Sequence, residues 1–178
     1  MYLYQKHYYD IVQRDLILSE NLLTVSMLSA PKRIDLALGG SSTDESYVIA
    51  SLAALNIITG QKPYFTQQKF IKQKTSSSRA GVGGKLTLRG SSMYRFWHKL
   101  LFEVFPYVKQ FEGLRAPRHE KIYCFLLKDI FVFQELVPLF RYFEDLDSLQ
   151  CQFHFTTKSK DEVVILSNSL QLCLSPRE

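Results

Sequence analysis

Residues Gly83–Phe96 read GGKLTLRGSSMYRF, and the fold depends on this stretch because it joins a strand pattern directly to a helix pattern. In its first half, Leu86 and Leu88 alternate with polar residues, which is the period of a strand with one buried face. We therefore expect a half-buried strand over 84–90. The residues on its other face are Lys85, Thr87 and Arg89. That face is predicted to be cationic and exposed.

The second half of the stretch predicts a helix. Ser91 or Ser92 is expected to cap it, because a serine hydroxyl accepts a hydrogen bond from an unpaired backbone N–H of the first turn. The helix is expected to end before Pro106. Its apolar residues at helical spacing are Phe96, Leu100 and Val104. Such a stripe is typical of a helix that packs against a core.

Similar patterns place the other elements. Two Ser-x-x-Glu capping boxes, at 42–45 and 159–162, mark helix starts, and Gly60 marks a helix end. The expected elements are a helix at 4–18, a strand at 33–38, a helix from 42–45 to Gly60, strands at 62–71, 121–127, 130–133 and 149–157, and a helix after 159–162. The helix that ends at Gly60 is expected to bury Val48, Leu52, Leu55 and either Ile58 or Thr59.

Strands that return with helices between them indicate an α+β fold, with a single mixed, mainly antiparallel sheet and helices packed on one face. With 178 residues, of which 46% are hydrophobic, the chain is expected to form one domain over 1–178. Residues 1–30 are its N-terminal helix and lead-in, and residues 31–178 its α+β core. The other face of the sheet is left to meet a partner.

Charge is concentrated in the middle of the chain. The net charge is +5, yet no acidic residue occurs from Ser46 to Phe102. The basic residues of that segment are Lys62, Lys69, Lys72, Lys74, Arg79, Lys85, Arg89, Arg95 and Lys99. A basic segment without acidic residues favours a polyanionic partner, because any acidic side chain in it would repel phosphate. A merely solvated basic face is the alternative. Tyr64, Phe65 and Phe70 are either stacking platforms for bases or sheet core.

The glycine-rich run at 76–84 raises a nucleotide-binding hypothesis. A phosphate-binding P-loop needs Gly, four residues and then Gly-Lys-Ser/Thr, because the hydroxyl holds magnesium. Here Gly84-Lys85 is followed by Leu86, and the position of the first glycine holds Arg79. A small nucleotide-binding protein or enzyme that uses this loop is therefore the weaker alternative to a nucleic-acid-binding module.

The sequence predicts no catalytic residue, no cofactor and no metal site. Its three cysteines and four histidines lack ligand spacing, and no nucleophile motif occurs. No run approaches the roughly 18 to 20 apolar residues of a membrane span. The first ten residues do not have the pattern of a secretory or organelle-targeting segment. We expect a protein of a reducing compartment that is not an enzyme.

Short motifs follow one another along nearly the whole chain. They are HYY (7–9), APKRIDLAL (30–38), LNIITGQKPYFT (55–66), GGKLTLRGSSMYRF (83–96), FEGL (111–114) and CQFHFTTKSKDEVVIL (151–166). Their order and spacing together are specific, although each alone is weak. With them, the chain resembles large-subunit ribosomal protein five of the bacterial type, a family of the central protuberance of the ribosome.

The resemblance implies a sheet-plus-helices fold and a structural role in the large ribosomal subunit. It implies binding to 5S rRNA or its local equivalent and to neighbouring large-subunit rRNA. It also implies a contact with P-site tRNA through the loop between the second and third strands, and a bridge to small-subunit ribosomal protein thirteen. Neighbouring proteins of the central protuberance are further expected partners, and no membrane is expected.

Carried over by position, the rRNA-facing polar residues of the family fall on Gln61 and Thr87, whereas its asparagine at the end of the first strand falls on Gly39. With the basic residues, the expected rRNA-binding set is Gln61, Lys62, Lys69, Lys72, Lys85, Thr87 and Arg89. The expected tRNA-facing loop, about Lys74 to Gly83, contributes Lys74, Ser76, Ser77, Ser78, Arg79, Gly81 and Gly83.

Departures from the family pattern indicate a diverged organellar copy. RAGVGG at 79–84 replaces a Gly-Met-Pro-Ile-Gly type of turn, and RAPRHEKIY at 115–123 shortens a glycine-containing connection. The chain is also rich in aromatic residues, at 13%. A mitochondrial ribosome is the expected location, with the bacterial cytoplasm or a plastid as the alternative.

Overall fold

The computed structural model describes residues 3–19, 27–39, 45–67, 81–115, 117, 119–146 and 148–174. The chain divides into two compact units. Unit 1 comprises Met1–Ile34, Leu88–Phe125 and Gln152–Glu178, and unit 2 comprises Asp35–Thr87 and Leu126–Cys151. The single domain expected over 1–178 stays a prediction.

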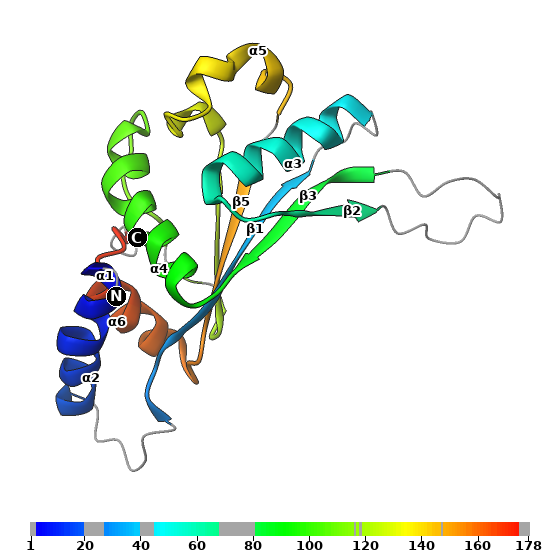
Figure 1. The fold of residues 1–178 in the computed structure, drawn as a ribbon. Helices are drawn as coiled ribbons and strands as arrows, with labels where there is room; N and C mark the ends of the chain where they lie inside the picture. Colours follow the sequence, from blue (N-terminus) through cyan, green and yellow to red (C-terminus); the bar gives the residue numbers. More distant parts are fainter. Residues whose placement is uncertain are drawn as a thin grey trace. The chain divides into compact units, whose positions relative to one another are not determined.

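The strands form one five-stranded antiparallel sheet (Figure 1). Its strands are β1 (Pro31–Gly39), β2 (Tyr64–Gln67), β3 (Gly81–Leu88), β4 (Ile122–Leu127) and β5 (Leu149–Phe155), in the order β2-β3-β1-β5-β4. In β5 every second residue from Leu149 to Phe155 is buried, as its alternation predicts. Together with the helices, the sheet confirms the α+β class.

The helix predicted at 4–18 is confirmed as one helical run, made of α1 (Leu3–His7), a π-helical turn η1 (Tyr8–Val12) and α2 (Gln13–Ser19). The other helical segments are α3 (Glu45–Thr59), α4 (Gly90–Lys99), η3 (Leu100–Val104), η4 (Phe105–Tyr107), η5 (Ile130–Val132), η6 (Val137–Leu139), α5 (Phe140–Phe143) and α6 (Lys160–Ser169). Within the described ranges, no helix is both long and apolar enough to span a membrane.

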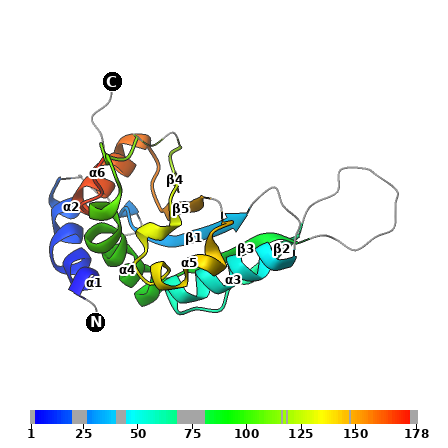
Figure 2. The same cartoon turned by 90° about the horizontal axis from the view of Figure 1, so that it is seen from above.

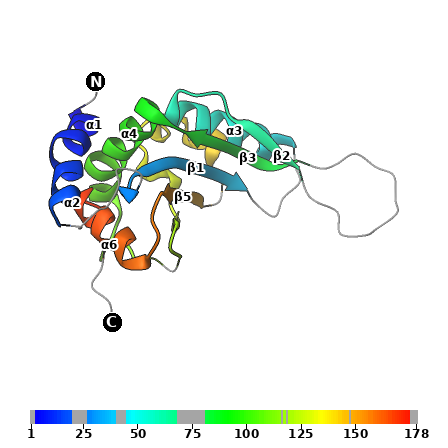
Figure 3. The same ribbon diagram turned by 90° about the horizontal axis from the view of Figure 1, so that it is seen from below.

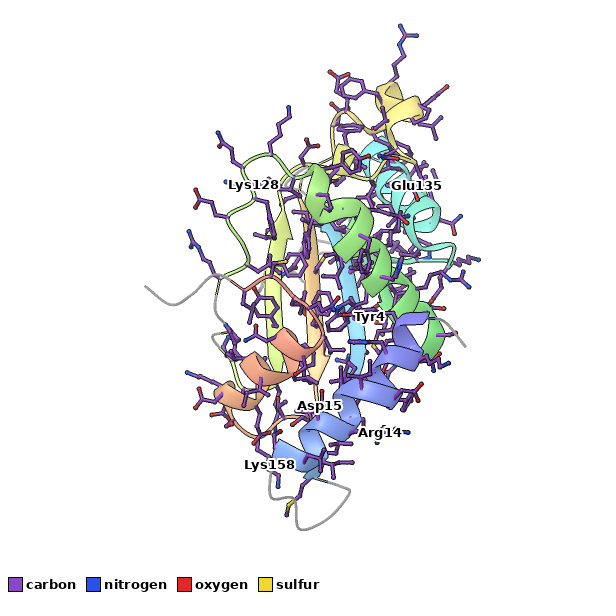
Figure 4. The ribbon with its side chains drawn as sticks, turned by 90° about the vertical axis from the view of Figure 1, so that its left-hand side faces the viewer. Tyr4, Arg14, Asp15, Lys128, Glu135 and Lys158 are labelled. Carbon is purple, nitrogen blue, oxygen red and sulfur yellow. The ribbon has the colours of Figure 1, made fainter. Side chains whose placement is uncertain are left out.

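Unit 1 is built around aromatic side chains. Trp97 of α4 is 1% exposed, and its ring meets Phe153 of β5 edge-on with centroids 4.6 Å apart. Phe153 also stacks on Phe125 of β4 at 5.5 Å. Tyr4 of α1 donates a hydrogen bond to the Leu170 carbonyl after α6, and Figure 4 shows it beside α4. Aromatic packing thus ties α4 to β4 and β5, and the Tyr4 hydrogen bond ties the N-terminal helix to the segment after α6.

Unit 2 packs α3 against one side of its strands. Figures 2 and 3 show that α3 lies on one side of β1 and β3 and does not cover their other side. The approach is close, because a Cβ at Gly84 would lie 3.0 Å from Leu55 Cδ1 and 3.2 Å from Leu52 Cδ2. α3 stops at Gly60, as predicted, and the φ of +70° at this residue is the left-handed conformation that ends a helix.

The buried face of α3 is rotated from the predicted one. Val48 and Leu52 are only half-buried. The residues that α3 buries are Tyr47, Ser51, Ala54, Leu55 and Ile58. Counting apolar residues missed Ser51, whose hydroxyl donates to the Val48 carbonyl at 2.7 Å and is therefore satisfied inside the helix.

The strand predicted at 130–133 is wrong. The segment forms the 3-10 turn η5, in which the Asp129 carboxylate accepts a hydrogen bond from the Phe131 N–H at 2.8 Å. Such a local side-chain bond competes with strand pairing. The turn still buries Ile130 and Val132, so the apolar residues of the pattern reach the core without a strand.

The capping box of α6 is confirmed in its first half. The Ser159 hydroxyl accepts from the Glu162 N–H at 3.2 Å. The Glu162 carboxylate accepts instead from the Lys158 N–H at 2.9 Å, one residue before the predicted position. Of the other box, only Glu45 lies within the described residues, where it begins α3.

The start of α4 differs from the prediction. Arg89 is the N-cap, in an extended conformation, and no side chain caps the helix. Gly90 follows with a φ of +56° and turns the chain into the helix before either serine is reached. Ser91 and Ser92 are therefore not caps. The predicted apolar stripe is confirmed, with Phe96, Leu100 and Val104 all buried.

Candidate nucleic-acid interface

The antiparallel pairing of β2 with β3 assigns each residue to a side. Tyr64 lies opposite Lys85, and Phe65 opposite Gly84. Directly opposed residues of an antiparallel pair share a side. Because the Gly84 position is directed at α3, Phe65 lies on the helix side and Tyr64 and Lys85 on the other. We call the side away from α3 the open face. Its residues on β2 and β3 are Tyr64, Thr66, Lys85 and Thr87.

Tyr64 and Phe65 are surface residues. Tyr64 is 52% exposed and Phe65 is 50% exposed, because β2 is the edge strand of the sheet. The interpretation of these two rings as sheet core is therefore wrong. On the open face, Tyr64 and Lys85 are direct partners across the two strands. Phe70, the third predicted stacking residue, lies outside the described residues.

Gln61 links the end of α3 to β3. Its Nε2 donates a hydrogen bond to the Thr87 carbonyl oxygen at 3.2 Å, and its backbone N–H donates to Thr59 Oγ1 at 3.3 Å. The two residues carried over as rRNA-facing, Gln61 and Thr87, are thus neighbours in unit 2. Lys62 follows directly and is exposed.

A buried acid engages the Thr87 side chain. The Thr87 hydroxyl donates to Asp35 Oδ1 of β1 at 2.8 Å, and Asp35 is only 5% exposed. Sequence analysis did not predict this pair. The available signal was an acidic residue inside the apolar run at 34–38.

The predicted loop ends earlier than expected. Gly81 and Gly83 belong to β3, where they pair with Gln67 and Thr66, and the register shifts between those two β2 residues. Gly83 is buried, and a Cβ there would lie 2.0 Å from the Leu38 carbonyl oxygen. The last glycines of the glycine-rich run therefore serve strand packing. These glycines do not form the phosphate-cradling loop before a helix that a P-loop requires.

Of the remaining predicted site residues, the structure describes Arg89. Arg89 is exposed at the start of α4 and belongs to unit 1. Lys69, Lys72, Lys74, Ser76, Ser77, Ser78 and Arg79 lie outside the described residues.

A second surface of unit 2, missed by sequence analysis, follows η6 and α5. We call it the α5 patch. Its exposed apolar residues are Val137, Leu139, Phe140 and Tyr142. The acidic residues Glu135, Glu144 and Asp145 flank it along the chain and are exposed. Sequence analysis did not single out the apolar residues that lie beside these acids.

Unit 1 contains an open cavity of about 380 Å³. It is lined by Tyr4, Lys6, His7, Asp10, Ile11, His98, Phe102 and Gln171. The His98 and Phe102 rings pack 4.6 Å apart at its wall. Across the described part of the chain, no three His, Cys, Asp or Glu side chains gather as a metal site.

Comparison with curated proteins gives long matches to ribosomal proteins, although no protein-family model matches the chain. The large ribosomal subunit protein uL5m of Reclinomonas americana is 30% identical over 179 residues, covering 97% of this chain and 98% of that protein. The protein uL5 of Mycoplasma pneumoniae is 30% identical over 139 residues, or 74% and 76%. The protein uL5c of Thalassiosira pseudonana is 31% identical over 120 residues, or 66% and 48%.

The chain belongs to the uL5 family of large ribosomal subunit proteins, as its motifs predicted. Its nearly full-length match to a uL5m protein identifies it as an organellar-type member, in agreement with the expected mitochondrial ribosome. Its role is accordingly structural, as a ribosomal protein.

Proposed function

We propose that unit 2 binds rRNA through the open face, within the central protuberance of a mitochondrial large ribosomal subunit. The RNA is 5S rRNA or its local equivalent, together with adjoining large-subunit rRNA. The observation that carries the proposal is the pairing of exposed Tyr64 with Lys85 on a sheet face that α3 leaves uncovered. An aromatic ring beside a cation suits an unpaired base and its phosphate.

Basic residues supply the sequence-independent part of this affinity. Lys85 lies on the open face, exposed Lys62 precedes β2, and Lys69 and Lys72 follow β2 along the chain. Arg89 of unit 1 is proposed to contact a separate stretch of RNA backbone. Each neutralised phosphate releases counterions, so the affinity is expected to fall steeply with salt.

The segment between β2 and β3 is proposed to contact P-site tRNA. It carries cations and hydroxyls, which bind phosphate oxygens without reading sequence. These residues are Lys74, Ser76, Ser77, Ser78 and Arg79. Gly81 and Gly83 then act as the strand anchor of the segment. Deletion of 74–79 is expected to spare incorporation into the large subunit and to weaken tRNA binding, measured on purified ribosomes.

The α5 patch is proposed as the surface that bridges to small-subunit ribosomal protein thirteen or to a neighbouring protein of the central protuberance. Exposed Phe140 and Tyr142 offer apolar anchors, and Glu144 and Asp145 would repel RNA phosphates while attracting a basic protein. Tyr142→Ala is expected to weaken subunit joining and to leave rRNA binding unchanged.

Charge reversal tests the proposed rRNA interface. Lys85→Glu is expected to lower the affinity for a 5S rRNA transcript about tenfold at physiological salt, because it removes one phosphate contact and adds a repulsive charge. The affinity is measured by filter binding over a salt series, with co-sedimentation on large subunits as the second readout. Lys128→Glu is the matched control, since Lys128 is an exposed lysine of the same unit outside the open face.

The two variants separate specific binding from bulk charge. Equal loss in both variants, or no loss in Lys85→Glu, would contradict binding through the open face. A protein that sediments only outside ribosomal fractions would contradict the ribosomal role as well.

A further inference from the structure

The hydrogen bond between Thr87 and Asp35 bears on what the open face recognises. We infer that Asp35 fixes Thr87 as a hydrogen-bond acceptor, so that this position selects a donor group of RNA, the ribose 2′-hydroxyl, rather than a phosphate oxygen. The inference rests on the proposed rRNA binding and adds a positioning residue that sets its specificity.

The direction of the bond follows from the chemistry of its partners. A carboxylate has only acceptor sites, so the proton between Asp35 Oδ1 and Thr87 Oγ1, 2.8 Å apart, comes from the hydroxyl. Asp35 is 5% exposed, so water competes little with Thr87 for its carboxylate. Once its proton is committed inward, a hydroxyl presents only lone pairs to an outside partner.

Gln61 forms a second hydrogen bond to Thr87, at its backbone. Its Nε2 donates to the Thr87 carbonyl oxygen at 3.2 Å, which places the amide group beside the threonine. A partner that reaches Thr87 therefore also meets a side-chain amide, which has a carbonyl oxygen as well as N–H groups. Lys62 and Lys85 flank the pair along the chain and provide the cations for phosphates.

The available groups match a nucleotide of RNA in a definite way. Phosphate oxygens only accept, so they gain nothing from Thr87 and are repelled by the nearby carboxylate. A 2′-hydroxyl donates and accepts, and it is the group by which a protein distinguishes RNA from DNA at a given site. The lysines bind the phosphates of the RNA backbone, and Thr87, positioned by Asp35, binds the ribose 2′-hydroxyl.

Interference mapping with 2′-deoxynucleotides tests the inference. A 5S rRNA transcript carrying random single 2′-deoxy substitutions is divided into bound and free fractions with the full-length protein. For the wild type, substitution at one or a few nucleotides is expected to reduce binding about threefold to tenfold, the size of one hydrogen bond. Asp35→Asn is expected to weaken this interference at the same nucleotide, because an amide N–H can donate to Thr87 Oγ1 and free the hydroxyl proton, which lets Thr87 bind a phosphate oxygen in place of the 2′-hydroxyl.

Two further variants separate specificity from folding. Thr87→Val removes the acceptor and should abolish the same interference, which keeps the test decisive if the Asp35 variant does not fold. Ser51→Ala, which removes a buried hydroxyl bonded to the Val48 carbonyl in the same unit, should leave the interference pattern unchanged.

Each outcome decides between the two proposals. A wild-type protein that binds with no 2′-deoxy interference, or variants at Asp35 and Thr87 that keep the wild-type pattern, would overturn this inference while rRNA binding stands. A wild-type protein that does not bind the transcript at all would overturn rRNA binding itself, and this inference with it.

Discussion

The two units differ in how their charges are arranged. Unit 2 has eight basic and eight acidic residues, but they are segregated: six basic and no acidic residues lie in 62–85, and five acidic residues and one basic residue lie in 129–147. Unit 1 has fourteen basic and nine acidic residues and so carries the whole excess of +5. Net charge alone would assign RNA binding to unit 1, whereas the segregation of basic from acidic residues assigns it to unit 2.

Each unit both buries and exposes aromatic side chains, but most ring contacts of the described residues lie in unit 1. Unit 1 buries Trp97 and four tyrosines whose pKa is raised by burial, namely Tyr4, Tyr8, Tyr94 and Tyr123. Unit 2 exposes Tyr64 and Phe140 to about half of their surface. We therefore expect the stability of unit 1 to be sensitive to truncation of aromatic side chains, and the RNA binding of unit 2 to be sensitive to charge reversal.

Trp97→Ala is expected to have the largest effect on stability. It should lower the free energy of unfolding by about 3–5 kcal/mol, because it removes the ring that packs against Phe153 and Phe155. Urea unfolding followed by circular dichroism measures it. Phe102→Ala is the control in the same unit, with a ring that is 54% exposed and an expected cost of about 0.5 kcal/mol. Similar costs for both would remove the contrast between core and surface aromatics.

Gly83→Ala is expected to cost about 3 kcal/mol in unit 2, because the new Cβ would overlap the Leu38 carbonyl oxygen and force β3 away from β1. Gly39→Ala is the matched control, since a Cβ there would lie 3.8 Å from the Val82 carbonyl oxygen, an ordinary contact. Trp97, the single tryptophan, reports on unit 1 by fluorescence. A shift of its transition in Gly83→Ala would show that the two units unfold together.

Local patterns in the sequence predicted the elements that depend on neighbouring residues. The join at 83–96 was predictable because alternation and helical spacing each require only a few adjacent positions, and Leu86 and Leu88 are buried as expected. The turn η5 was not predicted, because the Asp129 side chain overrides a strand-like composition. Elements set by the spacing of adjacent apolar residues were therefore predictable, whereas a turn set by a single side chain was not.

The candidate site was predictable in composition and not in geometry. Basic residues and the family motifs indicated the β2–β3 region, but the exposure of Tyr64 depends on β2 being an edge strand, which alternation does not reveal. The Asp35–Thr87 bond joins residues 52 positions apart. Such a contact depends on strand order and register, which a single sequence leaves open.

Alkaline pH is expected to destabilise unit 1 gradually. Burial, with a smaller contribution from Tyr9, raises the pKa of Tyr8 from 10 to about 12. Below pH 10 the folded and unfolded chains both keep this proton, so the stabilisation is complete. As the pH rises from 10 to 12 the unfolded chain loses the proton first, and the free energy of unfolding falls. Trp97 fluorescence in urea at pH 9 to 11 measures the slope.

Tyr8→Phe provides the control for this pH dependence. It removes one titrating group and the hydrogen bond to the Ser29 carbonyl at 3.3 Å. The variant should be less stable at pH 8 and should lose stability less steeply above pH 10. An unchanged slope would mean that Tyr8 ionises without unfolding, and that its ring is more accessible to water than the packing of unit 1 indicates.

The smallest expected effect is a difference in stability between variants of two serines of unit 1, Ser159 and Ser91, which were both predicted to cap a helix. Ser159→Ala should cost about 1 kcal/mol, because the hydroxyl accepts the Glu162 N–H at the start of α6. Ser91→Ala should cost close to nothing, because α4 begins at Gly90 without a side-chain cap and an exposed alanine favours a helix. Urea unfolding of the two variants in parallel measures the difference. Equal costs would place the start of α4 at the serines after all, and would move Arg89 from the cap to the strand that precedes it.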